Sequence, residues 1–315
     1  MPVMHQPFQH VVIIGCGLLG ASLGLALRKH HLARLITGVG RHGSPSLAIA
    51  RERRAIDRAT DDPALAVRGT ALPGESSAPP PADLVVLCLP VRQFPQMFQL
   101  IAPALAPGTI VTDVGSTKAQ VLQWAAQYLP AHAPFIGSHP MTGSEKSGPR
   151  AARDDLYQNA VCLLCQPPTT PAAASQRLTA LWRTLGMRLI PCDPAQHDRW
   201  VAAVSHLPYT LAATLVHTAA DPAALETAAG GFTDTSRIAS GDVSMWTDIL
   251  LTNRQPLLDI LARFQENLAA LRSAIDRSDE PAIRNFLTTA KTARDAFIAK
   301  RRAAGGGGDN GGGKT

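Results

Sequence analysis

The glycine pattern G-x-G-x-x-G occurs near the amino terminus, directly after the apolar run 11–14 and at the start of a predicted helix, 21–28. In such a place the first glycine permits a tight turn, the second lets backbone amides approach a pyrophosphate, and the third lets the helix pack against the strand. The positive end of the helix would then face the phosphates. The pattern predicts a dinucleotide site with these candidate binding residues: Gly15, Gly17, Leu18, Leu19 and Gly20.

The end of the second predicted strand, 35–39, bears on the type of nicotinamide cofactor. Folds of this kind that bind NAD usually place Asp or Glu there, where the carboxylate binds the 2′-hydroxyl of the ribose. Here Gly40 and Arg41 follow the strand instead. A guanidinium group can form charge-assisted hydrogen bonds with a 2′-phosphate. The sequence favours NADP, with NAD as the alternative.

Other candidate residues lie at the ends of further predicted strands, where open α/β folds bind ligands. Leu89 and Pro90 close the third strand, and Ser116 follows the fourth. His139 comes shortly after the run 135–137. A neutral imidazole at such a place could accept a proton during hydride transfer. We therefore take Leu89 and Pro90 as cofactor-binding candidates and His139 as the candidate base.

The elements that must position these residues alternate between β-rich apolar runs and helical segments. This alternation is typical of a parallel sheet with crossover helices. The sequence predicts a Rossmann-type α/β domain with a mostly parallel sheet over residues 8–193, and a Pro-rich surface loop at 72–81 within it. The predicted strands span residues 11–14, 35–39, 84–89, 109–113, 135–137, 160–164 and 188–190.

The β pattern ends near residue 193, where Asp193 and Pro194 are typical of a helix start. An all-helical second domain is predicted over residues 194–300, followed by a glycine-rich tail, 301–315, that we expect to be disordered. His197 and Asp198 follow the domain boundary. We interpret them as solvated or capping residues of the connecting helix, without a functional role.

Apolar residues recur at alternating spacings of four and three within the helical segment 255–278. Such a seam requires a long facing helix. That helix could come from the same chain or from the second chain of a dimer, and the pattern alone favours neither.

Composition excludes several classes of protein. The chain has 315 residues, 45% of them hydrophobic and 17% charged, which is too apolar for a disordered chain. It has no apolar run long enough to span a membrane and no export signal, so we expect a cytoplasmic protein. Half of the formal net charge of +6 lies in the last sixteen residues, which gives little support to nucleic-acid binding.

Five cysteines in apolar surroundings predict buried thiols, and Cys162 and Cys165 lack the further ligands of a zinc site, so no metal is expected.

Five separated blocks of the sequence resemble the prephenate and arogenate (cyclohexadienyl) dehydrogenases. The resemblance extends from about residue 11 to residue 297. The blocks are GCGLLGASL (15–23), DVGSTK (113–118), GSHPMTGSEKSG (137–148), SHLP (205–208) and GGFTDTSRIA (230–239) with the pair at 245–246. The resemblance implies oxidative decarboxylation of a small anionic substrate, either prephenate to 4-hydroxyphenylpyruvate or arogenate to tyrosine, with NAD or NADP. It also implies a homodimer formed by the helical domain, which favours the dimer explanation of the apolar seam.

The resemblance further implies roles for individual residues. His139 would be the base hydrogen-bonded to the C4 hydroxyl of the substrate, and Ser116 would orient that hydroxyl or the substrate. Arg237 would bind a substrate carboxylate, for which a bidentate guanidinium is suited. Tyr209 stands where some prephenate-using relatives have a second histidine, which leaves the choice between prephenate and arogenate open. The other residues implied to line or cover the substrate pocket are Ser144, Glu145, Ser205, His206, Asp234 and Trp246.

Two other functions compete with this one. A β-hydroxyacid dehydrogenase would combine similar domains, but that class usually requires a catalytic lysine in its helical domain, and residues 194–290 contain no lysine. A non-enzymatic dinucleotide sensor that binds nucleic acid would need a basic recognition helix. The basic cluster of this chain begins only at Lys300, next to the glycine-rich tail.

Overall fold

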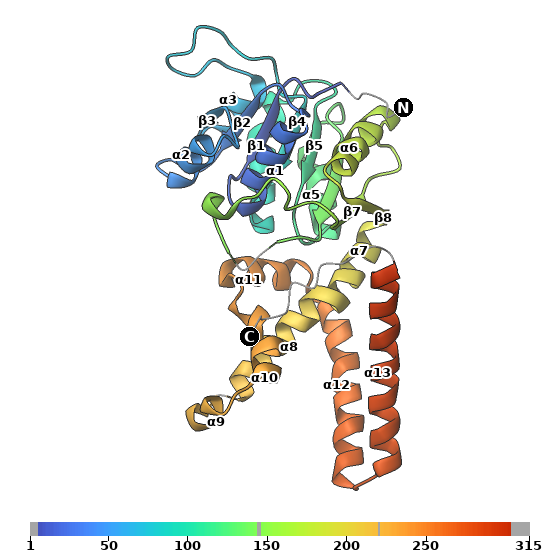
Figure 1. Ribbon diagram of the computed structural model, residues 1–315. Helices are drawn as coiled ribbons and strands as arrows, with labels where there is room; N and C mark the ends of the chain where they lie inside the picture. The colour runs from blue at the N-terminus through green and yellow to red at the C-terminus, as the bar shows by residue number, and fades with distance from the viewer. Residues whose placement is uncertain (1–5, 144–145, 220, 304–315) are drawn as a thin grey trace. The chain divides into compact units, whose positions relative to one another are not determined.

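The computed structural model of the chain describes residues 6–143, 146–219 and 221–303 (Figure 1). The chain divides into two compact units, Met1–Leu257 and Leu258–Thr315. The first unit contains an eight-stranded sheet, the helices that cover it and several later helices. The described chain changes from sheet to helices close to residue 194, because its last strand ends at Pro191.

The sheet has the strand order β3-β2-β1-β4-β5-β6-β7-β8, and neighbouring strands are parallel except for β6 and β7. This order confirms the predicted Rossmann-type domain with a mostly parallel sheet. The prediction missed β3, whose three residues include only one apolar side chain. The strands are β1 (Val11–Ile14), β2 (Ile36–Val39), β3 (Arg58–Thr60), β4 (Leu84–Leu87), β5 (Ile110–Asp113), β6 (Phe135–Pro140), β7 (Val161–Cys165) and β8 (Arg188–Pro191).

Helices cover both faces of the sheet because side chains alternate between the faces along each strand. In β1, Val11 and Ile13 belong to the apolar core that contains Leu23 of α1. Val12 and Ile14 belong to the opposite core, which contains Phe98 of α4. The helices of this part are α1 (Leu18–Lys29), α2 (Pro45–Glu52), α3 (Pro63–Arg68), α4 (Phe94–Ile101), α5 (Ala119–Tyr128) and α6 (Ala172–Thr184).

Only glycine fits at two positions near the start of α1, one in the turn after β1 and one in the first turn of the helix. Gly15 has a φ of +101°, and a Cβ atom on it would lie 2.4 Å from the carbonyl oxygen of Cys88. A Cβ atom on Gly20 would lie 2.0 Å from the carbonyl oxygen of Gly15. The two glycines therefore let α1 begin directly at the carboxyl end of β1, next to β4.

The helices after the sheet begin as the sequence predicts. Asp193 caps the first of them, since its carboxylate accepts a hydrogen bond from the backbone N–H of Gln196 at 2.8 Å. A π-helical turn, η4 (Ala202–His206), precedes Pro208, whose missing N–H interrupts the helical hydrogen bonds there. The helices are α7 (Pro194–Val201), α8 (Leu207–Thr218), α9 (Pro222–Glu226), α10 (Gly230–Ser236) and α11 (Val243–Thr252), with a 3₁₀ turn, η5 (Arg237–Ser240), between the last two.

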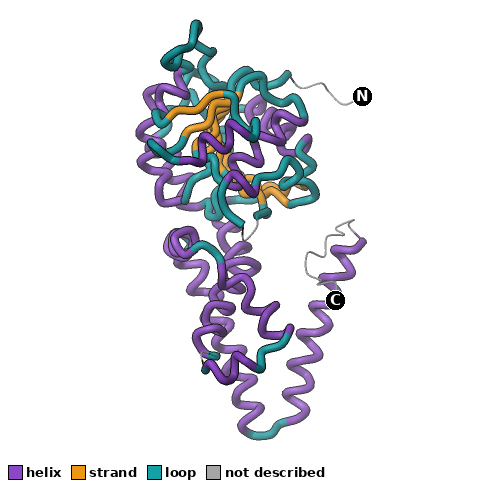
Figure 2. Tube along the Cα trace, turned by 60° about the vertical axis from the view of Figure 1, so that its left-hand side comes forward, coloured by secondary structure: helices purple, strands orange, loops and turns teal. Residues whose placement is uncertain are grey.

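The second unit consists of most of α12 (Arg254–Asp276) and all of α13 (Glu280–Ala303). Figure 2 shows these two helices diverging from the turn that connects them. Leu268 and Ile275 of the predicted apolar seam are more than half exposed in the single chain. Residues 301–303 of the predicted tail continue α13, and residues 304–315 lie outside the described part of the chain. None of the described helices is long and apolar enough to cross a membrane.

Candidate active site

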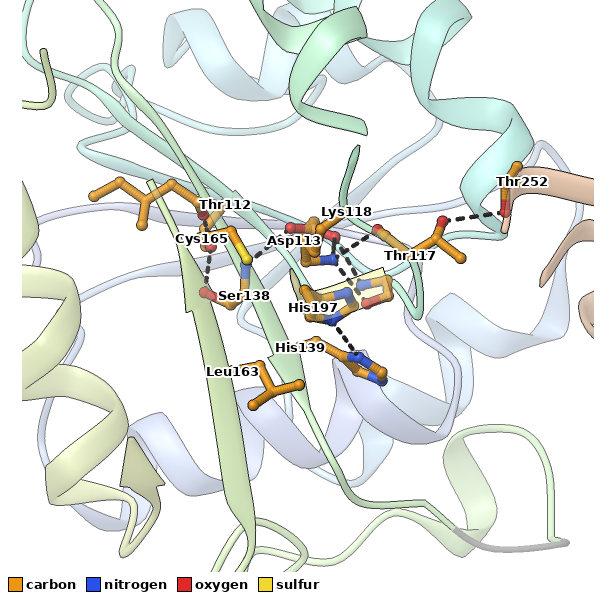
Figure 3. Close-up of polar contacts among 12 residues, drawn as sticks. Thr112, Asp113, Thr117, Lys118, Ser138, His139, Leu163, Cys165, His197 and Thr252 are labelled. Atoms are coloured by element: carbon orange, nitrogen blue, oxygen red, sulfur yellow. Dashed lines mark hydrogen bonds and ion pairs between the residues drawn. The ribbon is translucent and has the colours of Figure 1, made fainter. Parts of the chain in front are cut away.

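His139 lies near the end of β6 and is buried. Its Nδ1 atom is 2.9 Å from the Nε2 atom of His197, which comes from α7 (Figure 3). The Nδ1 atom of His197 is in turn 2.8 Å from a carboxylate oxygen of Asp198. Two histidines and one aspartate thus form a continuous hydrogen-bonded chain.

The interpretation of His197 and Asp198 as residues that are solvated or that cap the connecting helix is wrong for both. The two residues are 0% and 2% exposed. Asp198 does act as a cap, but on α5 rather than on its own helix, because its carboxylate accepts hydrogen bonds from the backbone N–H groups of Lys118 and Ala119. The sequence contained a signal for this burial. Residues 197 and 198 lie four positions before the apolar residues 201 and 202, respectively, and so share the same buried face of the helix.

A buried ion pair connects the β5–α5 turn with β6. Lys118 Nζ lies 2.6 Å from a carboxylate oxygen of Asp113, and neither side chain is exposed. Lys118 also donates hydrogen bonds to the carbonyl oxygens of Gly115 and Thr117, while Asp113 accepts from the backbone N–H groups of Gly115 and Ser138. The pair therefore fixes the turn that carries Ser116 and the strand that carries His139.

The charge state of His139 follows from its surroundings. Burial lowers the pKa of His139 well below its usual range, and the positive charges available on His197, Lys118 and His206 act in the same direction. Burial also lowers the pKa of His197, although the hydrogen bond to Asp198 opposes this effect. Both imidazoles are therefore neutral near pH 7, and a neutral imidazole can accept a proton.

His206 is buried beside this network, and its hydrogen bonds define its tautomer. The Nδ2 group of Asn253 donates to the backbone carbonyl of Asp198 and to Nδ1 of His206, both at 2.9 Å. Since burial lowers the pKa of His206 to about 4, the ring is neutral and carries its proton on Nε2. This N–H group has no hydrogen-bond partner in the described structure. A buried donor without a partner is a place where a ligand oxygen would bind favourably.

Two aromatic residues of the predicted pocket stack on one another. The rings of Tyr209 and Trp246 lie 3.7 Å apart and nearly parallel, and Trp246 also meets the ring of His206 edge-on. A Cβ atom at Gly241 would lie 2.4 Å from the indole nitrogen of Trp246, so only glycine leaves room for the indole there. The structure therefore brings His206, Tyr209 and Trp246 together from η4, α8 and α11.

Other predicted pocket residues do not belong to the hydrogen-bonded network of His139. Ser116 and Ser205 are half-buried. Asp234 on α10 and Arg237 at the start of η5 have exposed side chains. Ser144 and Glu145 lie outside the described residues.

The predicted cofactor residues fit a dinucleotide. Gly17 is the N-cap of α1 without a side-chain cap, and nothing lies within 4 Å of the place where its Cβ would be, so a phosphate can approach the first N–H groups of the helix. Leu18 and Leu19 form that first turn. Leu89 lies against Gly15, since one of its methyl carbons would be 2.9 Å from a Cβ on that glycine. Pro90 and Arg41 are exposed beyond the ends of β4 and β2.

The five cysteines are free thiols, of which Cys16, Cys162 and Cys165 are buried and the other two are half-buried. Burial raises the pKa of Cys162 to about 12, so this thiol is protonated. Cys165 lies 3.6 Å from Cys192, sulfur to sulfur. The described residues contain no group of three or more His, Cys, Asp or Glu that could hold a metal ion.

The Rossmann-type sheet, the glycine turn and the histidines at the carboxyl edge of the sheet define an NAD(P)-dependent oxidoreductase. The family model "Prephenate dehydrogenase, nucleotide-binding domain" matches residues 23–191, and "Prephenate dehydrogenase, dimerization domain" matches residues 193–289. The chain belongs to the prephenate dehydrogenase family.

Individual relatives agree with this assignment. The prephenate dehydrogenase of Bacillus subtilis is 32% identical over 298 residues, which cover 93% of this chain and 77% of that protein. The crystal structure of prephenate dehydrogenase from Aquifex aeolicus with hydroxyphenyl propionate and NAD⁺ matches with a TM-score of 0.84 and 29% identity, over 93% of this chain and 99% of that one. Synechocystis arogenate dehydrogenase matches with a TM-score of 0.76 and 29% identity, over 92% and 100%.

Replacing Lys118 by Met should destabilise the protein by about 3–5 kcal/mol at pH 8, because Asp113 would keep a buried charge without its cation. Burial already raises the pKa of Asp113, and the loss of Lys118 would raise it further. A carboxyl group whose pKa is raised by folding stabilises the folded state less as pH rises. The deficit relative to the wild type should therefore shrink from pH 8 to pH 5.

Thermal and urea unfolding at both pH values measure this deficit. The matched control is Lys29→Met, which removes only an exposed ion pair with Asp154 and should cost at most about 1 kcal/mol at either pH. Equal losses in the two variants would contradict the structural importance of the buried pair.

Proposed function

We propose that this chain is a prephenate dehydrogenase, which converts prephenate to 4-hydroxyphenylpyruvate and CO₂ with NADP or NAD in tyrosine biosynthesis. The observation that carries the proposal is the buried, neutral His139 at the end of β6, in a chain of the prephenate dehydrogenase family. Arogenate, which yields tyrosine in the same reaction, is the alternative substrate.

The reaction removes a hydride from C4 of the substrate ring and CO₂ from C1, and the ring becomes aromatic. The glycine turn would hold the pyrophosphate of the dinucleotide, and the oxidised nicotinamide of that cofactor would supply the hydride acceptor. His139 accepts the proton of the C4 hydroxyl as the hydride leaves and returns it to the same oxygen once CO₂ has departed, so no proton is lost overall. Ser116 orients the hydroxyl. Holding the reacting atoms in line supplies much of the remaining acceleration.

The anionic and polar groups of the substrate require donors, and the helical segments provide them. Arg237 binds a carboxylate, and the unpartnered Nε2–H group of His206 donates to a second substrate oxygen. Tyr209 and Trp246 supply an apolar wall. In our proposal the remaining pocket residues are Ser144, Glu145, Ser205 and Asp234.

Tyr209 is the residue that keeps arogenate in consideration. A histidine at this place could donate to the keto acid side chain as a cation, whereas the buried tyrosine is stacked on Trp246 and offers only its hydroxyl group. One of the structural relatives is an arogenate dehydrogenase. The two substrates differ only in this side chain, so a single pocket residue can decide between them.

We also propose a homodimer with the apolar seam of α12 at its core. The two helices of the second unit diverge from the turn that connects them (Figure 2). Large apolar side chains on both helices are exposed. Exposed apolar side chains in such number are typical of an interface. The matching family model for this segment is described as a dimerization domain. The exposed residues are Leu258, Leu268, Ile275, Leu287 and Phe297.

The first test is the reduction of nicotinamide, followed by absorbance, with prephenate and arogenate and with each cofactor. His139→Asn should lower kcat by about 10²- to 10⁴-fold and leave cofactor binding unchanged. Arg237→Ala should chiefly raise the KM for the substrate, by about tenfold or more. The control His217→Asn, at an exposed histidine of α8, should change neither constant. Full turnover by His139→Asn would remove His139 from its role.

The second test concerns the preference for NADP. Arg41→Ala should raise the KM for NADP by about tenfold or more and leave the KM for NAD within about twofold, because only NADP has a phosphate on the ribose. The control Arg34→Ala removes an exposed arginine at the opposite end of β2. If Arg41→Ala raised the KM values for both cofactors equally, Arg41 would not bind the 2′-phosphate of the ribose.

The third test concerns the dimer. Light scattering on the purified protein at micromolar concentration should give twice the 33.3 kDa mass of one chain. Leu268→Glu should shift the protein to monomers, because a charge would be buried in the seam. Leu100→Glu places the same charge at an exposed residue of α4 and should leave the dimer intact. A wild-type mass of one chain would contradict the dimer.

A further inference from the structure

We propose that Asp198 and His197 are positioning residues that hold His139 in the tautomer with its proton on Nδ1 and its lone pair on Nε2. We further propose that the same two hydrogen bonds share the proton that His139 takes up. The proposal deepens the proposed function, on which it rests for the identity of the proton donor. It concerns residues 197 and 198, for which the sequence suggested no role.

The carboxylate of Asp198 makes two hydrogen bonds to backbone groups, and the direction of both is fixed. One carboxylate oxygen accepts from the backbone N–H of Lys118 at 2.8 Å and the other from that of Ala119 at 3.0 Å. A backbone N–H can only donate, so both oxygens are acceptors. The first oxygen also lies 2.8 Å from Nδ1 of His197. His197 must therefore carry a proton on Nδ1.

The tautomer of His197 fixes the direction of its hydrogen bond with His139. A neutral His197 with a proton on Nδ1 has its lone pair on Nε2. That atom lies 2.9 Å from Nδ1 of His139, which must then be the donor (Figure 3). His139 is left with its lone pair on Nε2, the ring nitrogen that faces away from this hydrogen bond. The relation between a base and the group that fixes its tautomer is the same as in a Ser-His-Asp triad.

The competing arrangement places a second proton on His197. His197 would then be a cation beside Asp198 and would donate to Nδ1 of His139, which would have its proton on Nε2 and no lone pair for the substrate. Burial and the charge of Lys118 both lower the pKa of His197 and disfavour this state in the resting protein. Lys118 itself forms an ion pair with Asp113, in which Nζ lies 2.6 Å from a carboxylate oxygen.

The competing arrangement becomes favourable once His139 has accepted a proton on Nε2. The Nδ1 proton of His139 can then move to Nε2 of His197, which leaves His139 neutral and His197 positively charged. The charge would then lie next to the carboxylate of Asp198, which favours a cation on His197, whereas the charges that act on His139, those of His197, Lys118 and His206, all disfavour a cation there. His139 takes up one proton on Nε2 and passes its Nδ1 proton to Nε2 of His197, so the step needs no further reactant.

His206 provides an internal contrast for the tautomers. The Nδ2 group of Asn253 also donates to the carbonyl of Asp198, which fixes the orientation of the amide. Its second hydrogen bond therefore donates to Nδ1 of His206, and the proton of that ring lies on Nε2. His139 and His197 should show one tautomer and His206 the other, within one protein and under one set of conditions.

Nitrogen NMR of the substrate-free protein with ¹⁵N-labelled histidine measures these tautomers directly at pH 7.5. We expect protonated Nδ1 in His139 and His197 and protonated Nε2 in His206, with each signal assigned by its loss in a variant of that histidine. Protonated Nε2 in resting His139 would overturn the proposal. This readout does not require turnover, so it also stands apart from the proposed function. A protein with the expected tautomers that oxidises neither prephenate nor arogenate would overturn the function alone.

Two variants of His197 separate positioning from packing. His197→Gln can place its amide oxygen where Nε2 was and so keeps an acceptor for His139. His197→Asn can place its amide N–H where Nδ1 was and so keeps a donor for Asp198 but offers no acceptor to His139. We expect His139 to keep its Nδ1 proton in the first variant and to lose this preference in the second.

The kinetics of the same pair test the consequence. Neither amide can take up a proton, so both variants should have a lower kcat than the wild type, and His197→Asn should fall at least about tenfold below His197→Gln. The KM values for cofactor and substrate should stay within about threefold, and the two melting temperatures should agree within a few degrees. Equal kcat values and equal His139 spectra in the two variants would show that His197 only fills space, and would overturn the proposal.

Discussion

Asp113 and Lys118 form an ion pair that has no contact with solvent at the carboxyl edge of the sheet. A buried charge is tolerated only when its partner and its remaining hydrogen bonds are in place. Here each of the three donors of Lys118 has an acceptor, and Asp113 accepts two backbone N–H groups in addition to the lysine. These bonds reach the β5–α5 turn on one side and β6 on the other. The positions of Ser116 and His139 therefore depend on an ion pair whose two residues are not themselves predicted site residues.

The sequence predicted the elements with strong local signals and missed those whose role depends on distant partners. The glycine turn was predictable from the G-x-G-x-x-G pattern between a strand and a helix. The structure gives the reason for the pattern, since a side chain at Gly15 or Gly20 would collide with backbone atoms. β3 was missed because a three-residue strand carries little hydrophobic periodicity. His139 was predicted as a site residue from its place at a strand end and from the family's motif. His197 lies 58 residues away in sequence, and only the packing of α7 against the sheet domain brings it to His139.

The helical half shows a similar limit. The apolar seam of α12 was visible in its spacing, but spacing cannot reveal whether the facing helix belongs to the same chain. The structure shows that two residues of the seam, Leu268 and Ile275, are more than half accessible in a single chain. Burying an apolar side chain stabilises a protein by about 1.5–3 kcal/mol relative to leaving it exposed. A second copy of the chain is the simplest way to bury them.

The proposed base, His139, is buried at the edge of the sheet and so faces two opposing requirements. It must be neutral to accept a proton, and burial provides this by lowering the pKa of His139. It must also tolerate the charge that it accepts, and burial alone would prevent this. In our proposal Asp198 reconciles the two requirements, because its negative charge lies one histidine away from His139. There it would leave resting His139 neutral and still stabilise a proton that moves to His197. An aspartate bonded directly to His139 would instead favour the imidazolium before the substrate arrives.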